Sequence, residues 1–109
     1  MHKLEGMIGL CVKAGKVVFG SEQCAMRARG GRLPLVIVAE DASENTKKRM
    51  QDKCHSFGVP LLFFGTVSSL AKATGKGRVS ALGIGDKGFA AAILKIYGGG
   101  DIGKNSKAE

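Results

Sequence analysis

The chain of 109 residues has few of the side chains on which enzymes, membrane proteins and disulfide-stabilised secreted proteins depend. It has two histidines and no Ser-His-Asp sequence context, so no hydrolytic machinery is visible. Three cysteines, an odd number, argue against a secreted disulfide framework and favour a reducing compartment. No stretch approaches the roughly 18 uninterrupted apolar residues of a membrane span, and the amino end lacks the apolar run of a signal peptide. We therefore expect a cytoplasmic protein that is not an enzyme, has no cofactor and does not enter membranes.

Aromatic residues are also scarce, with no tryptophan, one tyrosine and five phenylalanines. Basic residues are abundant, because 17 Lys and Arg against 9 Asp and Glu give a net charge of +8 and a pI of about 9.7. This charge predicts a polyanionic partner, while the few aromatics argue against a surface on which bases stack. With 44% hydrophobic residues the chain can bury a core. We expect a small globular domain that binds nucleic acid by its shape or by exposed base edges.

Hydrophobic spacing and glycine positions predict alternating helices and strands. The predicted helices are one before Gly15, one capped by Ser21 that ends near Arg29, one before Gly58, a short one capped near Ser68 that ends at Gly75, and one capped by Asp86. The predicted strands cover residues 17–19, 35–39, 60–64 and 79–84. Strands covered by helices on both faces predict an α/β/α three-layer sandwich. We expect one domain over residues 1–97 and a flexible tail over residues 98–109, which shows no periodicity.

The cysteines lie on predicted apolar helix faces, and Cys54 shares its face with Met50 and Phe57. The last helix has a similar face formed by Phe89, Ile93, Ile96 and Tyr97. No second closely spaced pair of ligands accompanies Cys54 and His55, so core packing is favoured over a metal site for Cys11, Cys24 and Cys54.

Two glycine patterns suggest nucleotide binding, and both lack the required context. Residues 83–88 spell G-x-G-x-x-G between a strand and a helix, but no strand follows that helix. Residues 98–104 match G-x-x-x-x-G-K, but Asn105 occupies the position of the magnesium-binding Ser or Thr. We interpret the first pattern as turn glycines, and a nucleotide-binding enzyme remains the least favoured alternative.

The basic residues fall into two clusters around a nearly neutral centre. The first precedes Leu33 (Lys13, Lys16, Arg27, Arg29, Arg32) and the second follows Leu70 (Lys72, Lys76, Arg78, Lys87). Because loops gather at the carboxyl ends of strands in α/β folds, we expect the glycine-marked loops at 19–21 and 75–78 to converge. The helix start at 21–23 offers N–H donors and side-chain acceptors for bases, while Lys76 and Arg78 neutralise phosphates. The alternative is an ordinary capped helix with a solvated charged face.

Four segments follow one another at spacings that resemble the L7Ae/L30e superfamily of ribosomal and kink-turn RNA-binding proteins. They are residues 19–23, 35–42, 58–60 and 70–76, and residues 40–46 and 52–54 resemble its small bacterial YlxQ-like branch. The resemblance covers residues 4–97 and implies a four-stranded mixed sheet, no catalysis and association with the ribosome. It also implies binding to a kink-turn, which is an internal bend in RNA flanked by sheared G·A pairs.

The family's guanine-reading motif, Gly-x-Asn-Glu-x-x-Lys, falls on residues 20–26, and its bend-covering loop falls on residues 75–79. Glu22 stands in place of the Asn, Gln23 in place of the Glu and Met26 in place of the Lys, and Ala71 replaces a usual Gly. Each lost charged contact costs ~1–3 kcal/mol. Arg27 follows Met26 but points about 100° further around the helix. The predicted RNA-binding residues are Lys16, Gly20, Ser21, Glu22, Gln23, Met26, Arg27, Lys76, Gly77, Arg78 and Val79.

One alternative remains besides the nucleotide-binding enzyme. A protein-interaction adaptor would use the same fold, with its basic face providing only non-specific RNA affinity. We expect a monomer, which is the default for this size and surface, with RNA and the ribosome as partners.

Overall fold

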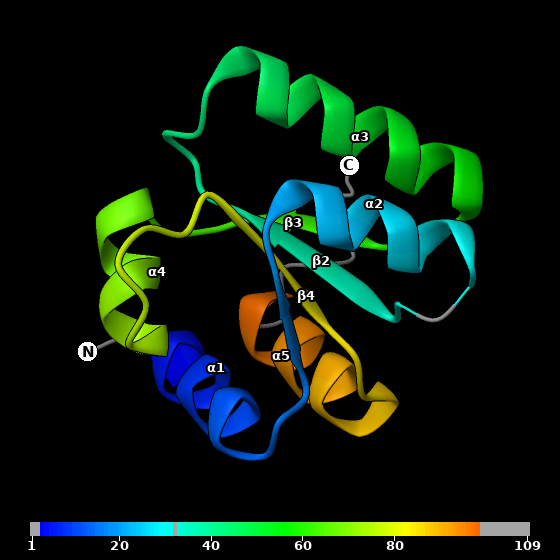
Figure 1. The fold of residues 1–109 in the computed structure, drawn as a ribbon. Helices are drawn as coiled ribbons and strands as arrows, with labels where there is room; N and C mark the ends of the chain where they lie inside the picture. Colours follow the sequence, from blue (N-terminus) through cyan, green and yellow to red (C-terminus); the bar gives the residue numbers. More distant parts are fainter. Residues whose placement is uncertain (1–2, 32, 99–109) are drawn as a thin grey trace.

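The computed structural model describes residues 3–31 and 33–98, which form a four-stranded sheet between two layers of helices (Figure 1). The helices are α1 (Lys3–Lys13), α2 (Ser21–Arg29), α3 (Glu44–Phe57), α4 (Val67–Thr74) and α5 (Lys87–Gly98). The strands are β1 (Val17–Phe19), β2 (Leu35–Val38), β3 (Leu61–Phe63) and β4 (Ala81–Ile84). The predicted three-layer α/β/α architecture is confirmed. Arg32 and residues 99–109, which hold most of the second glycine pattern and the predicted tail, lie outside the described residues.

The sheet is mixed and has the order β1-β4-β2-β3. The last strand, β4, runs antiparallel to both of its neighbours, whereas β2 and β3 are parallel. Consequently the carboxyl ends of β1, β2 and β3 lie at the same edge of the sheet as the amino end of β4. We call this end of the sheet, which is formed by strand termini and not by an outermost strand, the upper edge. Phe19 at the end of β1 pairs there with Leu82 near the start of β4.

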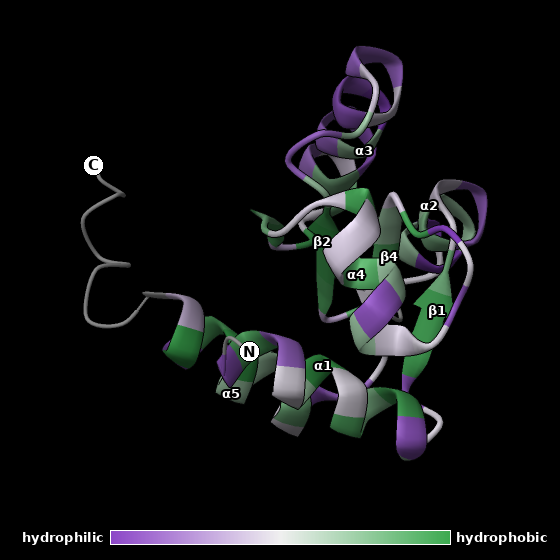
Figure 2. Ribbon diagram, turned by 90° about the vertical axis from the view of Figure 1, so that its left-hand side faces the viewer, coloured by the Kyte–Doolittle hydropathy of each residue, from purple (hydrophilic) through white to green (hydrophobic). Residues whose placement is uncertain are grey.

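The two helical layers are α2 with α3 on one face of the sheet and α1 with α5 on the other, with α4 packed against α1 (Figures 1 and 2). Every residue of the two central strands, β2 and β4, is buried. The continuous apolar run at residues 35–39 follows from this cover on both faces. The predicted core cysteines, Cys11, Cys24 and Cys54, are also buried.

Two predicted helix caps are wrong. Ser21 is the first residue of α2, and Gly20 holds the cap position with φ 94° and no side-chain hydrogen bond. The predicted cap Ser68 lies inside α4, whose cap is Thr66 in a reciprocal pair with Ser69. Thr66 and Ser68 both carry hydroxyl groups that can cap a helix, and the reciprocal hydrogen bonds between Thr66 and Ser69 place the cap at Thr66.

Several predicted boundaries and faces also differ. The strand expected from Val79 begins at Ala81, because residues 79 and 80 complete the incoming loop. The strands expected over 35–39 and 60–64 are shorter and cover Leu35–Val38 and Leu61–Phe63. Phe57 is 39% exposed and Tyr97 is 43% exposed, since each lies in the last turn of its helix beyond the buried part of its face. Asp86 caps α5 as predicted, accepting a hydrogen bond from the N–H of Phe89 at 2.9 Å.

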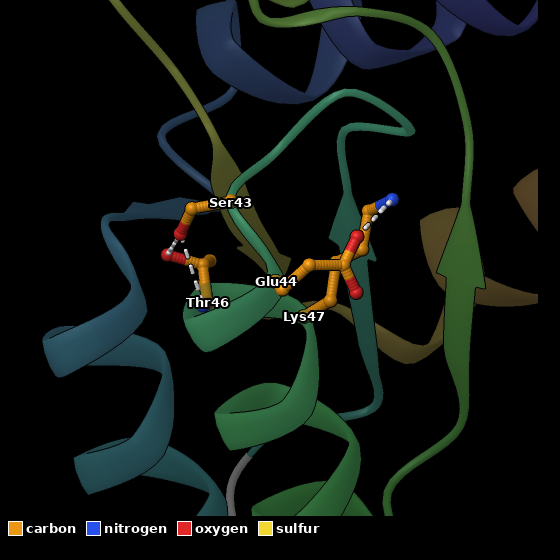
Figure 3. A network of polar contacts seen from close by, with 4 residues as sticks. All are labelled: Ser43, Glu44, Thr46 and Lys47. Carbon is orange, nitrogen blue, oxygen red and sulfur yellow. Dashed lines mark hydrogen bonds and ion pairs between the residues drawn. The ribbon is translucent and has the colours of Figure 1, made fainter.

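The start of α3 is fixed by short-range polar contacts (Figure 3). The hydroxyl of Ser43 accepts the N–H of Thr46 at 3.1 Å and donates to the Thr46 hydroxyl at 3.0 Å. Lys47 and Glu44 form an ion pair of 3.7 Å within the first turn. These contacts set where α3 leaves the upper edge and therefore how it lies beside α2.

The glycine at the start of the G-x-G-x-x-G pattern serves packing. A Cβ on Gly83 would lie 2.8 Å and 2.9 Å from the two terminal carbons of the buried Leu33 side chain. The second glycine, Gly85, donates its N–H to the Lys16 carbonyl oxygen at 2.7 Å. This supports the interpretation of the pattern as a packed strand-to-helix turn.

Replacing Gly83 by Ala is therefore expected to destabilise the fold by ~1–3 kcal/mol through overpacking against Leu33. The matched control is Gly77→Ala, because nothing lies within 4 Å of a Cβ placed there. Urea unfolding of the two variants measures the difference. Equal free energies of unfolding would show that Leu33 moves aside without cost.

Candidate nucleic-acid interface

The β1–α2 junction and the loop between α4 and β4 meet at the upper edge of the sheet (Figure 1). The N–H of Gly20 donates to the carbonyl oxygen of Ala81 at 3.0 Å. The ammonium group of Lys76 lies 4.8 Å from the centre of the Phe19 ring, in a cation–π contact. The predicted convergence of these two loops is confirmed. The two loops meet because β4 runs antiparallel to β1 and β2. The loop that precedes β4 therefore lies at the end of the sheet where β1, β2 and β3 finish.

The loop over residues 75–79 is held at both ends and exposed in the middle. Gly75 adopts a left-handed conformation (φ 77°) and donates its N–H to Ala71, which turns the chain out of α4. Val79 is only 3% exposed, so its side chain anchors the loop in the core and is unavailable to a ligand. Lys76, Gly77 and Arg78 are exposed between these anchors.

The predicted residues of α2 divide between two sides of the helix. Cys24 and Ala28 are buried and attach α2 to the sheet. Gln23 and Arg27 are exposed and, four residues apart, lie on the same side of the helix. Glu22 and Met26 instead line a groove between α2 and α3. Among the described residues no side chain caps α2, so the N–H groups of its first turn have neither an intrahelical partner nor a capping group there.

The groove between α2 and α3 contains residues that the sequence analysis did not select. The α3 guanidinium of Arg49 donates to the Glu22 carboxylate at 2.8 Å. The groove is lined by Glu22, Ala25, Met26 and Arg29 of α2 and by Arg49, Lys53 and Phe57 of α3. Arg49 and Lys53 belong to the nearly neutral centre of the sequence. Because Arg49 and Lys53 are four residues apart, the sequence predicts that they lie on the same side of a helix. It does not predict that α2 lies opposite that side.

Lys16 is the one predicted residue that the structure places away from the others. It precedes β1, and its carbonyl oxygen accepts the N–H of Gly85 at the end of β4. The three residues of β1 separate it from Gly20, so the four steps along the strand span about 13 Å. Lys87 begins α5 just after the same end of β4. Neither lysine therefore lies at the upper edge.

The sequence matches a known family over nearly all of the described fold. The profile described as the ribosomal protein L7Ae/L30e/S12e/Gadd45 family matches residues 2–94. The chain belongs to this family. The family prediction drawn from the spacing of the four segments is confirmed.

Individual proteins are also similar to this chain over most of their length. The RNA-binding protein YlxQ of Enterococcus faecium is 36% identical over 98 residues, which cover 90% of this chain and 94% of the relative. YlxQ of Bacillus subtilis (strain 168) is 33% identical over 90 residues, covering 83% of this chain and 90% of the relative.

Two solved structures are also similar. A protein of unknown function from Bacillus halodurans C has a TM-score of 0.85 and 31% identity, over 88% of this chain and 97% of that one. The Giardia lamblia 15.5kD RNA binding protein, at a TM-score of 0.73 and 21% identity, shares the fold over 88% of this chain and 82% of its own.

The cysteines of this family member are packing residues in the described fold. Burial, with a smaller contribution from the nearby Cys54, raises the pKa of Cys24 to about 12. Burial also raises the pKa of Cys11 to about 11, with a smaller contribution from Asp86, and that of Cys54 to about 11. Within residues 3–31 and 33–98, no three His, Cys, Asp or Glu side chains come together as a metal site. None of the described helices is long and apolar enough to cross a membrane.

The raised thiol pKa values predict a loss of stability at alkaline pH. Above the ordinary thiol pKa of 9.0 the unfolded chain releases protons that the folded chain retains up to pH 11 or 12. The free energy of unfolding should therefore fall as pH rises from 9 to 11. Urea unfolding across this range measures the slope, and Cys24→Ala should make it shallower. An identical slope in that variant would contradict the assignment to Cys24.

Proposed function

We propose that this chain is a non-enzymatic RNA-binding protein that recognises a kink-turn or similarly bent RNA and works in association with the ribosome. The observation that carries the proposal is the meeting of the start of α2 with the loop over residues 75–79. This meeting presents hydrogen-bonding groups beside exposed cations, as a contact to both bases and phosphates requires. Both curated relatives are named as RNA-binding proteins, which supports the same class of ligand.

The chemistry of the two elements suits a bent RNA. The Gln23 side chain is exposed, and its amide oxygen accepts a hydrogen bond from the amino group of a guanine. Uncapped N–H groups at the start of α2 favour a phosphate or a base acceptor. Lys76 and Arg78 neutralise phosphates, and Gly77 between them lets the RNA backbone approach closely because no side chain intervenes.

The charge of the whole chain supports the same ligand class. A net charge of +8 favours fast, salt-dependent association with any RNA. Shape-specific recognition must therefore come from contacts that a straight duplex cannot make. The junction at the upper edge provides them, since a base exposed by a bend can reach Gln23 while its flanking phosphates reach the loop.

The test is a binding titration with a kink-turn RNA and with the same RNA lacking its G·A pairs, at two salt concentrations. The unchanged protein should prefer the kinked RNA at both. Gln23→Ala should reduce that preference, while Arg78→Ala should weaken both complexes and lower the salt slope by about 1.

Lys95→Ala is the control, because Lys95 is exposed on α5 in the opposite helical layer. Unchanged thermal unfolding of all three variants would separate binding from folding. Equal, steeply salt-dependent binding to both RNAs would reject kink-turn recognition. No binding to either RNA would reject the RNA-binding function and favour the protein-interaction adaptor.

A further inference from the structure

The groove between α2 and α3 joins exposed apolar side chains to free cations. Met26 is 65% exposed and Phe57 is 39% exposed, and both line this groove with the small Ala25. Arg29, Arg49 and Lys53 also line it, against a single acidic residue, Glu22. Exposed apolar groups beside several cations in one groove indicate a binding surface rather than a chance exposure of one side chain.

The charges of this groove are arranged so that its only carboxylate is already paired. Arg49 holds Glu22 at 2.8 Å, and that ion pair bridges the two helices where the groove begins. Arg29 and Lys53 form no ion pair within the part of the chain that the structure describes. The lining residues therefore carry a net charge of +2, from three cations and one anion, and two of the three cations are unpaired.

The shape of the groove suits part of an extended polymer. Its volume of about 240 Å³ is below the roughly 300–1,000 Å³ of small-molecule pockets. It also begins at Glu22, one residue after Ser21 at the start of α2. An RNA strand bound at the start of α2 can continue into the groove without leaving the protein surface.

We propose that the α2–α3 groove is a second RNA-contact surface, in which Arg29 and Lys53 neutralise phosphates and an unpaired base packs on Met26 and Phe57. This inference rests on the proposed RNA-binding function. Arg49 is a positioning residue in it, because pairing with Glu22 removes a carboxylate charge that would otherwise repel the RNA backbone. An RNA is favoured over an acidic protein segment because the groove is continuous with the start of α2.

The first experiment removes a cation and an apolar side chain of the groove, one at a time. Lys53→Ala should weaken binding of the kink-turn RNA roughly fivefold and lower the salt slope by about 1. Met26→Ala should also weaken binding but leave the salt slope unchanged, because it removes the surface on which the base packs and removes no charge. Lys95→Ala, on the opposite helical layer, should leave affinity unchanged.

The second experiment tests the positioning role of Arg49. Arg49→Met should weaken RNA binding more than Lys53→Ala, since it removes a cation and exposes the Glu22 charge. The double variant Glu22→Gln with Arg49→Met should recover part of that loss. A double variant as weak as Arg49→Met alone would show that Arg49 contacts RNA directly and does not act through Glu22.

The outcomes separate this inference from the proposed function. If Lys53→Ala and Arg49→Met bind RNA normally while Gln23→Ala and Arg78→Ala do not, the groove inference is wrong and the RNA-binding function stands. If the unchanged protein binds no RNA, the proposed RNA-binding function is rejected, and the groove inference that rests on it is rejected as well. If RNA binding survives the groove variants and an acidic peptide with apolar side chains binds the unchanged protein but not Lys53→Ala, the groove serves a protein partner instead.

Discussion

The antiparallel insertion of β4 between β1 and β2 is the constraint on which the rest of the structure depends. It pairs the end of β1 with the start of β4, so the loop leaving α4 reaches the place where α2 begins. The same pairing leaves both central strands buried by helices on each face. If β4 ran parallel to its neighbours, Lys76 and Arg78 would lie at the opposite edge, far from α2. The candidate site is therefore a consequence of strand direction.

Much of this fold follows from local signals in the sequence. The continuous apolar run of β2, the helix face of Leu4 and Ile8, and Asp86 before α5 each reflect a short-range rule. The cap of α4 was less predictable because Thr66 and Ser68 both carry hydroxyl groups, and that of α2 because Gly20 caps it without a side chain. The direction of β4 is not encoded locally at all, since it depends on which strands lie beside it. Convergence of the two loops was predicted correctly, although its physical reason is visible only in the assembled sheet.

The candidate site shows the same division between local and tertiary information. The start of α2 and the glycine-bounded loop over residues 75–79 could be selected from residue types and spacing. The partner of Glu22 could not, because 27 positions separate it from Arg49 and the ion pair exists only where two helices lie side by side. Charge counting assigned Arg49 and Lys53 to a neutral segment. In the structure their neighbours in space, not in sequence, determine the charge of the groove.

Most of the acidic residues near the upper edge have neighbouring partners. The Glu22 carboxylate is paired with Arg49, that of Glu44 with Lys47, and that of Asp41 accepts the N–H of Val67 at the start of α4. Each partner satisfies a carboxylate that would otherwise oppose an RNA phosphate. Within residues 3–31 and 33–98, Glu40 is the only one of these four acids whose carboxylate has no such partner, and it follows the end of β2. Meanwhile Lys76 is held over Phe19, which fixes one cation where α2 begins. The ion pairs of Glu22 and Glu44, with Lys76 held over Phe19, thus offset the negative charge where α2 and the loop over residues 75–79 meet.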